Sequence, residues 1–334
     1  MINVLELRPN PNSKSNGIDK YCNALRSMFA DDNINILPVM NYPMKKGKIL
    51  KERYVRGVLD QAISNQNVDI IHINGFASFS VVQMFWHAKM AKKKIVYTAH
   101  WHPFEYLNHP LRAKLFFYFL LKPLIKWCAD VVVTINNEDT AFFKSFHKNV
   151  KQIPHWIEEN LPSFCPSIEK DPNMVLFVGR FNDSNKGAEH LLYLPEGKYN
   201  IHCVGPCNGE LRSDMVSHVN ISFEELRALY SKASLLVVPS RYEAFSYVAL
   251  EALSNDTPVL LSDRVRISDY LKDIRGVNVF QYHNYKDFCN KVNHSIGGKV
   301  DIERIKRIFS ESIVRSQYRN LFHSLYPILL SNKV

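Results

Sequence analysis

Several features that would narrow the function of this chain are scarce or missing from its sequence. Glycine is scarce, at 12 of 334 residues, and the six cysteines contain no C-x-x-C pair and form no readable disulfide framework. Free thiols in a reducing compartment are therefore expected. No run of about 18 charge-free apolar residues occurs, and no basic, long apolar leader precedes the first strand-like segment. We therefore expect no membrane-spanning helix and a cytoplasmic location.

The composition is that of a globular protein, since 46% of the residues are hydrophobic and 12% are aromatic. The length allows two domains. The net charge of +10 is uneven, because residues 1–160 contain 21 Lys and Arg against 13 Asp and Glu, and the remainder contains 21 against 19. A basic N-terminal half indicates an anionic partner, namely a membrane surface, nucleic acid or a phosphorylated substrate. A merely basic protein is the alternative.

Apolar strand-like segments alternate with helical patterns along the whole chain. This alternation predicts parallel sheets wound with right-handed crossovers. A proline-rich stretch at about 158–172 is typical of a linker, and Pro123 is expected to kink or break the helix predicted at 110–130. The tail at 302–330 is expected to be helical. The predicted strands are 3–7, 34–40, 68–75, 94–100, 130–135 and 150–154, then 174–178, 199–204, 234–238, 258–261 and 277–280.

One stretch, Val237–Leu253, combines a strand, a polar loop and a helix that is expected to begin near Phe245. Glu243 lies in the loop and Glu251 lies eight residues later, a spacing that places two residues on roughly one face of a helix. Ligands of open α/β sheets bind where such strands end and helices begin. The alternative is a buried helix with a capping glutamate.

A second polar loop, Gly179–Gly187, follows the first strand of the second half. It carries Arg180 and Lys186, and such cations bind phosphate oxygens. Positive charge at this position would stabilise a departing diphosphate. The alternative is a pair of solvated surface cations.

In order and spacing, these residues resemble the donor-binding half of family 4 of the retaining glycosyltransferases. The first half of the chain is similar to that family in three further segments, Asp69-Ile70-Ile71-His72, Tyr97-Thr98-Ala99-His100 and Ala129-Asp130-Val131-Val132. In the second half the likeness rests on Phe177-Val178-Gly179-Arg180 with Lys186-Gly187, Leu229-Tyr230, Ala233, Pro239-Ser240, Glu243, Phe245, Leu250-Glu251-Ala252-Leu253 and Thr257-Pro258-Val259.

The resemblance implies a GT-B fold, in which two Rossmann-like parallel-sheet domains of the α/β class face a cleft. The implied domains are 1–157 on the acceptor side, 158–315 on the donor side, and a helix at 316–334 that packs back on the first domain. The implied reaction is transfer of a sugar from a UDP- or GDP-sugar to a lipid-linked saccharide, with retention of configuration, in bacterial surface polysaccharide synthesis such as O-antigen or capsule.

The resemblance also assigns residues. Arg180 and Lys186 would hold the diphosphate, Glu243 would bond sugar hydroxyls and Glu251 would bond the ribose. His100 would lie against the sugar, and Gly17 would lie in a loop near the phosphates and the acceptor. The remaining donor-binding residues are Gly179, Ala244, Phe245, Ser246 and Tyr247.

The sequence departs from the family pattern at three loops. Ala244 and Ser246 stand where the family usually has glycine, Arg264-Val265-Arg266 replaces a Gly-Gly turn, and Asn16-Gly17 replaces a double glycine. These changes affect the expected identity of the donor sugar and base more than the expected class of reaction.

Neither a metal nor a cofactor is expected, because no Asp-x-Asp pair occurs to hold a metal on a sugar nucleotide. His100-Trp101-His102 with His109 could imitate a zinc site. Ordinary loop histidines, or contacts to the acceptor, are the favoured interpretation of His102 and His109.

The segment from Arg112 to Lys126 has two interpretations. Its four cations, Arg112, Lys114, Lys122 and Lys126, fall on one side of a helical wheel around an aromatic centre. It is either a core helix with a hydrated polar face or an interfacial helix lying on anionic lipid. The second would make the protein peripheral on the inner face of the cell membrane.

Two other functions stay open. One is a sugar-nucleotide epimerase on the same fold. The other is a basic nucleic-acid-binding protein, which is disfavoured because no RNA-recognition aromatic motif, helix-turn-helix or zinc spacing appears.

Overall fold

The computed structural model describes residues 1–9, 17–30, 32–42, 60, 63, 67–75, 78–100, 110–157, 168–207 and 211–326. Within them the chain forms two compact units. Unit 1 comprises the described residues of 1–155 and 311–326, and unit 2 comprises those of 156–310. The boundaries expected from the sequence fall after residues 157 and 315.

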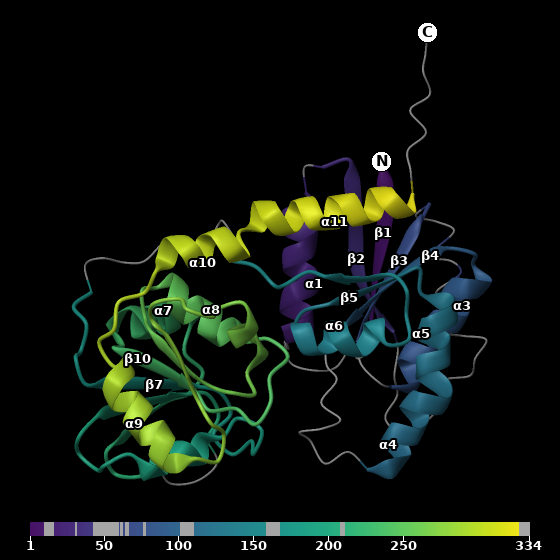
Figure 1. The fold of residues 1–334 in the computed structure, drawn as a ribbon. Helices are drawn as coiled ribbons and strands as arrows, with labels where there is room; N and C mark the ends of the chain where they lie inside the picture. Colours follow the sequence, from purple (N-terminus) through teal and green to yellow (C-terminus); the bar gives the residue numbers. More distant parts are fainter. Residues whose placement is uncertain are drawn as a thin grey trace. The chain divides into compact units, whose positions relative to one another are not determined.

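Unit 1 is built on a six-stranded parallel sheet with the order β2-β1-β3-β4-β5-β6 (Figure 1). The order reverses between β1 and β3, so their carboxyl ends form the switch point at which such sheets bind ligands. The strands are β1 (Ile2–Pro9), β2 (Ile34–Tyr42), β3 (Ile70–Gly75), β4 (Lys94–Ala99), β5 (Val131–Thr134) and β6 (Val150–Gln152).

Helices cover both faces of this sheet, because its central strands are buried on both sides. On one face, α3 (Phe79–Met90), α5 (Lys122–Cys128) and α6 (Asn137–Lys144) contribute to a buried cluster around Leu5 and Ile71. On the other face lies α1 (Gly17–Met28), whose Tyr21, Cys22, Leu25 and Met28 are buried.

The last helix, α11 (Glu311–Leu325), completes the α1 face of unit 1. Tyr318 lies beside Tyr21, and the ring of Phe322 packs edge-on against Phe29. In Figure 1 this helix is drawn in yellow and crosses the upper end of α1. The expected helical tail is interrupted, since Ser310 is extended between α10 (Ile302–Phe309) and α11.

Pro123, which was expected to kink or break its helix, does not break it. The segment from α4 (Leu111–Phe116) to α5 is continuous through a π turn at Phe117–Leu121, in which Lys122 N–H donates to the Phe117 carbonyl. Proline lacks an N–H and crowds the carbonyl four residues before it. The π turn changes the hydrogen-bond spacing immediately before Pro123, which is a frequent role of such turns inside helices.

Unit 2 contains a second six-stranded parallel sheet with the order β12-β11-β10-β7-β8-β9. Its order reverses between β7 and β10. The strands are β7 (Met174–Val178), β8 (Asn200–Val204), β9 (Met215–His218), β10 (Leu235–Val238), β11 (Val259–Ser262) and β12 (Val277–Phe280). The sequence predicted all of these except β9, in which both Val216 and Ser217 are exposed, so no apolar pattern marks it.

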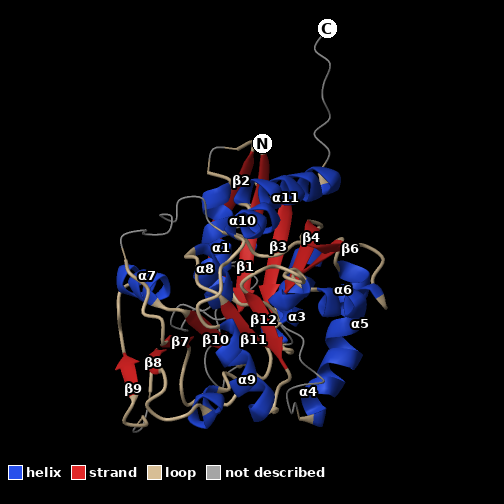
Figure 2. Ribbon diagram, turned by 60° about the vertical axis from the view of Figure 1, so that its left-hand side comes forward, coloured by secondary structure: helices blue, strands red, loops and turns tan. Residues whose placement is uncertain are grey.

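Helical segments flank this sheet as well, as the blue and red ribbons of Figure 2 show. They are η2 (Ala188–Tyr193), α7 (Phe223–Lys232), α8 (Tyr247–Ser254), η3 (Arg266–Asp269), α9 (Tyr285–Ser295) and α10. In the part of the chain that the structure describes, no helix is long and apolar enough to cross a bilayer.

Candidate functional site

The loops after β7 and β10 meet at the switch point of unit 2. Gly187 has a φ of 68°, and a Cβ atom on it would lie 1.9 Å from the carbonyl oxygen of Pro239. Only glycine permits this approach. Two further bonds join the loops, from Arg241 N–H to the Asn185 carbonyl at 2.8 Å and from the Asn185 amide to the Tyr242 carbonyl at 3.0 Å.

The join between the loops places Lys186 against Glu243. Lys186 Nζ donates to Glu243 Oε1 at 2.7 Å, and the hydroxyl of Ser240 donates to the same oxygen at 2.7 Å. The Glu243 carboxylate raises the pKa of Lys186, against the opposing effect of burial. Lys186 is therefore fully charged at neutral pH. A bound diphosphate would meet this ammonium at the switch point, next to a carboxylate that can accept hydroxyl protons.

Arg180, the second predicted phosphate ligand, has a different environment. Its guanidinium donates to Asp183 at 2.5 Å, and its side chain is 68% exposed. An exposed ion pair contributes little to stability, so the guanidinium can exchange this partner for a ligand at small cost. Gly179 at the start of the loop donates its N–H to the Val204 carbonyl.

Glu243 does not lie on the helix that carries Glu251. The helix α8 begins at Tyr247, and Glu243 instead forms a short parallel bridge with the segment after β11. Its N–H donates to the Arg264 carbonyl at 3.2 Å, and its carbonyl accepts from Arg266 N–H at 2.9 Å. Glu243 therefore lies in the loop, as expected, and the spacing of residues on one helical face does not apply to this pair. The segment that replaces the family's Gly-Gly turn supports Glu243 through its backbone.

Glu251 is held by a partner from another helix. The hydroxyl of Tyr230 on α7 donates to Glu251 Oε2 at 3.0 Å, and the Tyr230 ring is completely buried. Burial, followed by the negative charge of Glu251, raises the pKa of Tyr230. The phenol therefore remains a donor, and it fixes one carboxylate oxygen of Glu251.

Four of the seven residues between these glutamates, Ala244 to Tyr247, stand at the start of α8. Ser246 is buried and is the N-cap, with its hydroxyl accepting from Ala249 N–H. Phe245 packs against Tyr247 and against Phe309 of α10. Ala244 is buried. The N-cap explains Ser246 without reference to a sugar, and the sequence analysis missed it.

In unit 1, His100 follows β4 and is partly buried. Its Nε2 lies 3.0 Å from Asn74 Oδ1, and its ring stacks on His155 and meets Tyr21 edge-on. Burial lowers the pKa of His100, and His155 and His72 lower it further. Gly17 is exposed at the first position of α1, with no atom within 4 Å of a Cβ built on it.

No group of three or more His, Cys, Asp or Glu in the described ranges is arranged to hold a metal ion. His102 and His109, which the sequence analysis considered as zinc ligands, lie outside those ranges.

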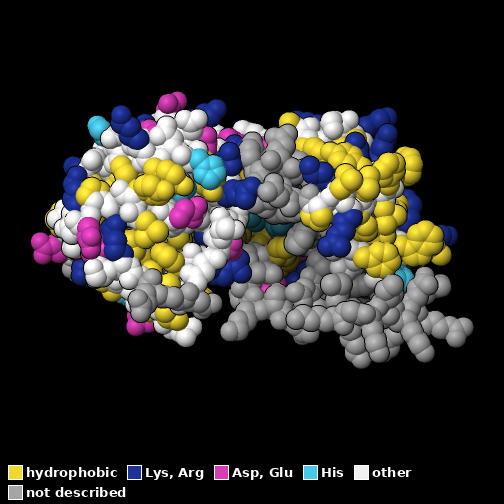
Figure 3. Space-filling model, turned by 90° about the horizontal axis from the view of Figure 1, so that it is seen from below, with side chains coloured by type: hydrophobic (Ala, Val, Ile, Leu, Met, Phe, Trp, Pro, Cys, Tyr) yellow, Lys and Arg dark blue, Asp and Glu magenta, His cyan; other side chains and the backbone are white. Residues whose placement is uncertain are grey.

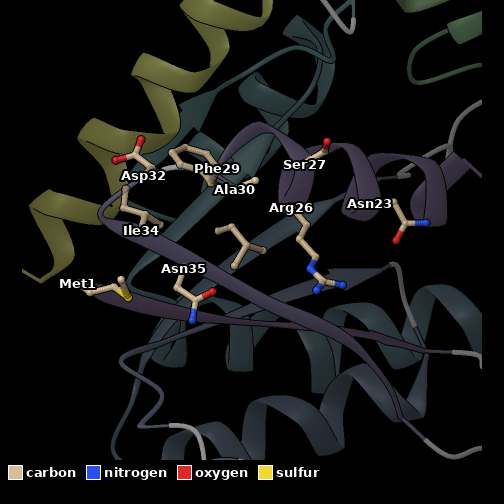
Figure 4. A pocket seen from close by; sticks show the side chains of 10 residues that line it. Met1, Asn23, Arg26, Ser27, Phe29, Ala30, Asp32, Ile34 and Asn35 are labelled. Atoms are coloured by element: carbon tan, nitrogen blue, oxygen red, sulfur yellow. The ribbon is translucent and has the colours of Figure 1, made fainter. Parts of the chain in front are cut away.

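A cavity of about 630 Å³ lies between α1 and β2 in unit 1 (Figure 4). Arg26 is the cation among its lining residues, and Asp32 at its rim is already bonded to Arg319. None of the predicted site residues lines this cavity.

Comparison with known proteins identifies the segment that contains the joined loops. Residues 172–296 match the family model described as "Glycosyl transferases group 1". These residues form a glycosyl transferases group 1 domain. The predicted enzyme class, a glycosyltransferase, is thereby confirmed.

Three curated proteins are similar in sequence to this glycosyltransferase. An uncharacterized 41.2 kDa protein in the cps region of Klebsiella pneumoniae is 25% identical over 70% of the chain and 70% of that protein. An uncharacterized glycosyltransferase of Methanocaldococcus jannaschii is 32% identical over 34% of the chain and 33% of its own length. The O-antigen chain mannosyltransferase RfbU of Salmonella typhimurium is 24% identical over 54% of the chain and 61% of its own length.

Solved structures share the fold over almost the whole chain. Sucrose-phosphate synthase from Thermosynechococcus elongatus has a TM-score of 0.73 at 17% identity, covering 98% of this chain and 99% of that one. HepE of Anabaena in complex with UDP-glucose has a TM-score of 0.74 at 13% identity, covering 97% of this chain and 100% of that one. The predicted fold, two parallel-sheet α/β domains as in GT-B glycosyltransferases, is confirmed.

Within unit 2, the structure brings Gly179, Lys186 and Glu243 together at the switch point, with Glu251 at the adjoining helix. Sequence reasoning did not include Ser240 and Tyr230 among the site residues, although both stand in the motifs that carried the resemblance. Both residues place a buried hydroxyl against a glutamate. Ser240 lies 3 residues from Glu243 in the chain and Tyr230 lies 21 residues from Glu251, and these contacts are visible in the structure but not in the sequence.

Proposed function

We propose that the chain transfers a sugar from a UDP- or GDP-sugar to a saccharide hydroxyl, with retention of configuration at the sugar. The observation that carries this proposal is the ion pair of Lys186 and Glu243 across the switch point of unit 2. It provides an ammonium for the diphosphate and a carboxylate for sugar hydroxyls at one place, with Arg180 in the same loop. Retention follows from the resemblance to a retaining family.

In the proposed reaction, the bond from the anomeric carbon to the diphosphate breaks, a bond to the acceptor oxygen forms on the same face, and the proton of the acceptor hydroxyl passes to the departing diphosphate. Negative charge develops on the departing diphosphate. Lys186 and Arg180 would stabilise this charge, which lowers the barrier because the cations are in place before the reaction. Glu251, fixed by Tyr230, would accept hydrogen bonds from the ribose hydroxyls.

The named relatives support a role in bacterial surface polysaccharide synthesis. One similar protein is encoded in a cps region and another is an O-antigen chain mannosyltransferase. The HepE structure contains UDP-glucose, which supports a nucleotide-sugar donor. A lipid-linked saccharide is the proposed acceptor.

The α4–α5 segment supports a membrane location for this acceptor. Its exposed apolar side chains include Leu111 and Trp127, each 71% exposed, and Phe119, 78% exposed. Arg112 and Lys126 are exposed among them, and Figure 3 shows Lys and Arg beside hydrophobic side chains on unit 1. Aromatic side chains that can insert, next to cations for headgroups, are typical of a surface that binds anionic lipid.

Sedimentation with liposomes tests the membrane surface. The protein should bind vesicles containing anionic lipid at low salt, and less at high salt, because charge attraction is screened. The double variant Phe119→Ser with Trp127→Ser should bind less, whereas Leu192→Ser, an equally apolar change on an exposed residue of unit 2, should not differ from wild type. Failure of the wild type to bind anionic vesicles at low salt would contradict the membrane proposal.

A thermal-shift panel of nucleotide sugars tests the donor site. A ligand at a hundred times its Kd stabilises the folded state by about 2.7 kcal/mol. One nucleotide series should raise the melting temperature of the wild type and of Lys306→Met, whose lysine forms an exposed ion pair with Glu303. The same series should have a smaller effect on Lys186→Met. Equal shifts in both variants would remove Lys186 from the donor site.

We also propose that transfer needs no metal ion, on the ground that the sequence has no Asp-x-Asp pair. Turnover should then be unchanged by EDTA. Loss of activity in EDTA, restored by Mg²⁺ or Mn²⁺, would contradict this proposal.

A further inference from the structure

A buried carboxyl group, that of Glu6, lies at the switch point of unit 1 and has no role in the proposed function. Glu6 is on β1 directly opposite His72 on β3, and its side chain is completely buried. Nδ1 of His72 lies 2.7 Å from Glu6 Oε1, and the side-chain amide of Asn74 donates to Glu6 Oε2. The thiol of Cys22 donates to the same Oε2 at 3.6 Å. A carboxyl group buried this deeply needs several hydrogen-bond partners.

These contacts fix which way the Asn74 amide points. Its nitrogen lies against two oxygens, Glu6 Oε2 and the His72 backbone carbonyl, both of which accept hydrogen bonds. The reverse orientation would place the amide oxygen against two acceptors and is therefore excluded. Asn74 Oδ1 consequently points to Nε2 of His100, 3.0 Å away. Because an amide oxygen only accepts, Nε2 of His100 must carry a proton.

The proton on Nε2 determines what the other nitrogen of His100 can do. The lowered pKa keeps the ring neutral at pH 7, and a neutral imidazole has one N–H and one lone pair. The lone pair is therefore on Nδ1. His155 stacked at 6.0 Å and Tyr21 edge-on at 4.8 Å restrict rotation of the ring.

We propose that Glu6 and Asn74 are positioning residues, which hold His100 with its proton on Nε2 so that Nδ1 accepts a hydrogen bond from a hydroxyl of the bound sugar or saccharide. This inference rests on the proposed function for the identity of the ligand. It excludes His100 from stabilising the diphosphate, since a lone pair and a phosphate oxygen repel. It gives His100 a preference for a hydroxyl group.

Nitrogen NMR of the full chain labelled with ¹⁵N-histidine tests the tautomer directly. The wild type should show His100 as the neutral Nε2–H form at pH 7, and Asn74→Ala should convert it to a mixture or to the Nδ1–H form. Thr98→Val is the matched control. It removes the partner that lies 2.6 Å from His72 Nε2 in the same buried network, but it leaves the Asn74–His100 bond intact. The His100 signals should be unchanged in this control.

If His100 of the wild type is in the Nδ1–H form, the proposal is overturned. This result does not require any variant to fold. An unchanged His100 spectrum in folded Asn74→Ala also overturns it.

Kinetic measurements test whether sugar transfer depends on this tautomer of His100. Asn74→Ala should lower kcat by about 10-fold to 100-fold, the effect known for removing the hydrogen-bond partner that orients a metal-bound histidine. Nucleotide affinity should remain close to wild type. The losses from Asn74→Ala and His100→Ala should not add in the double variant, because both remove one interaction. Additive losses would contradict the positioning role. If no sugar nucleotide is turned over at all, the proposed function fails, whereas the NMR result still decides the tautomer.

Discussion

Replacing Lys186 by methionine removes one charge from the proposed donor site and keeps most of the side-chain volume. In the structure, Lys186 Nζ is one of two donors to Glu243 Oε1, and Ser240 is the other. The variant leaves Glu243 with the serine alone. The substitution therefore changes both the stability of unit 2 and the charge available to a diphosphate.

The magnitude of each effect follows from the burial of the pair. The side chains of Lys186 and Glu243 are 27% and 12% exposed. This lies between an exposed ion pair, worth about 0–1 kcal/mol, and a buried one, whose disruption costs about 3–5 kcal/mol. We expect a loss of about 2 kcal/mol, or a fall in melting temperature of about 4–8 °C for a unit of this size. Loss of transition-state charge stabilisation should lower kcat by about 10²–10³-fold.

Nucleoside diphosphate release, measured well below the melting temperature of the variant, separates the two effects. Lys306→Met is the control, because it removes a lysine from an exposed ion pair in the same unit. A Lys186→Met enzyme that is destabilised as expected but turns over at the wild-type rate would refute the assignment of this lysine to the diphosphate.

Three other variants test separate parts of the account. Glu251→Gln should raise the Kd for nucleotide by about 10-fold to 100-fold in a titration, since hydrogen bonds to a charged group are worth about 1.5–3 kcal/mol; an unchanged Kd would remove the ribose role. Burial lowers the pKa of His155 to about 3, with Lys20 contributing, so its neutral form stabilises unit 1 above pH 6.5 and this stabilisation is lost as the pH falls towards 3. Urea unfolding of His155→Phe should therefore depend less on pH, by up to about 1.4 kcal/mol per pH unit, and the exposed His294→Gln should behave as wild type. Ser246→Ala should cost about 1 kcal/mol in urea unfolding through loss of the α8 cap, and no change would contradict the cap.

The sequence predicted eleven of the twelve strands that the structure describes, and the position of the loops that carry Lys186 and Glu243. Strands buried on both faces produce continuous apolar runs, such as Leu235–Val238, which are visible in a single sequence. Gly187 and Glu243 were assigned to ligand-binding loops from the order of the motifs in the sequence. Their proximity could not be predicted, because it depends on the approach of the Gly187 backbone to Pro239.

The remaining features depend on contacts between distant residues. Pro123 was expected to kink or break a helix, and a π turn just before it keeps the helix continuous. Ser246 was expected among the donor-binding residues, and its hydroxyl caps a helix that begins two residues later than expected. Glu6 was not singled out, although a glutamate in an otherwise apolar strand is an unusual signal. Its partners His72 and Asn74 lie more than 60 residues away.

The most direct test of the central claim is the release of nucleoside diphosphate from UDP- and GDP-sugars by the purified protein, with and without a lipid-linked saccharide. The account predicts release that depends on the acceptor and a product of one added sugar with the anomeric configuration of the donor. Interconversion of donors without an acceptor would indicate the epimerase instead. Salt-sensitive binding to RNA with no release from any donor would indicate the nucleic-acid-binding alternative, and either result would contradict the account.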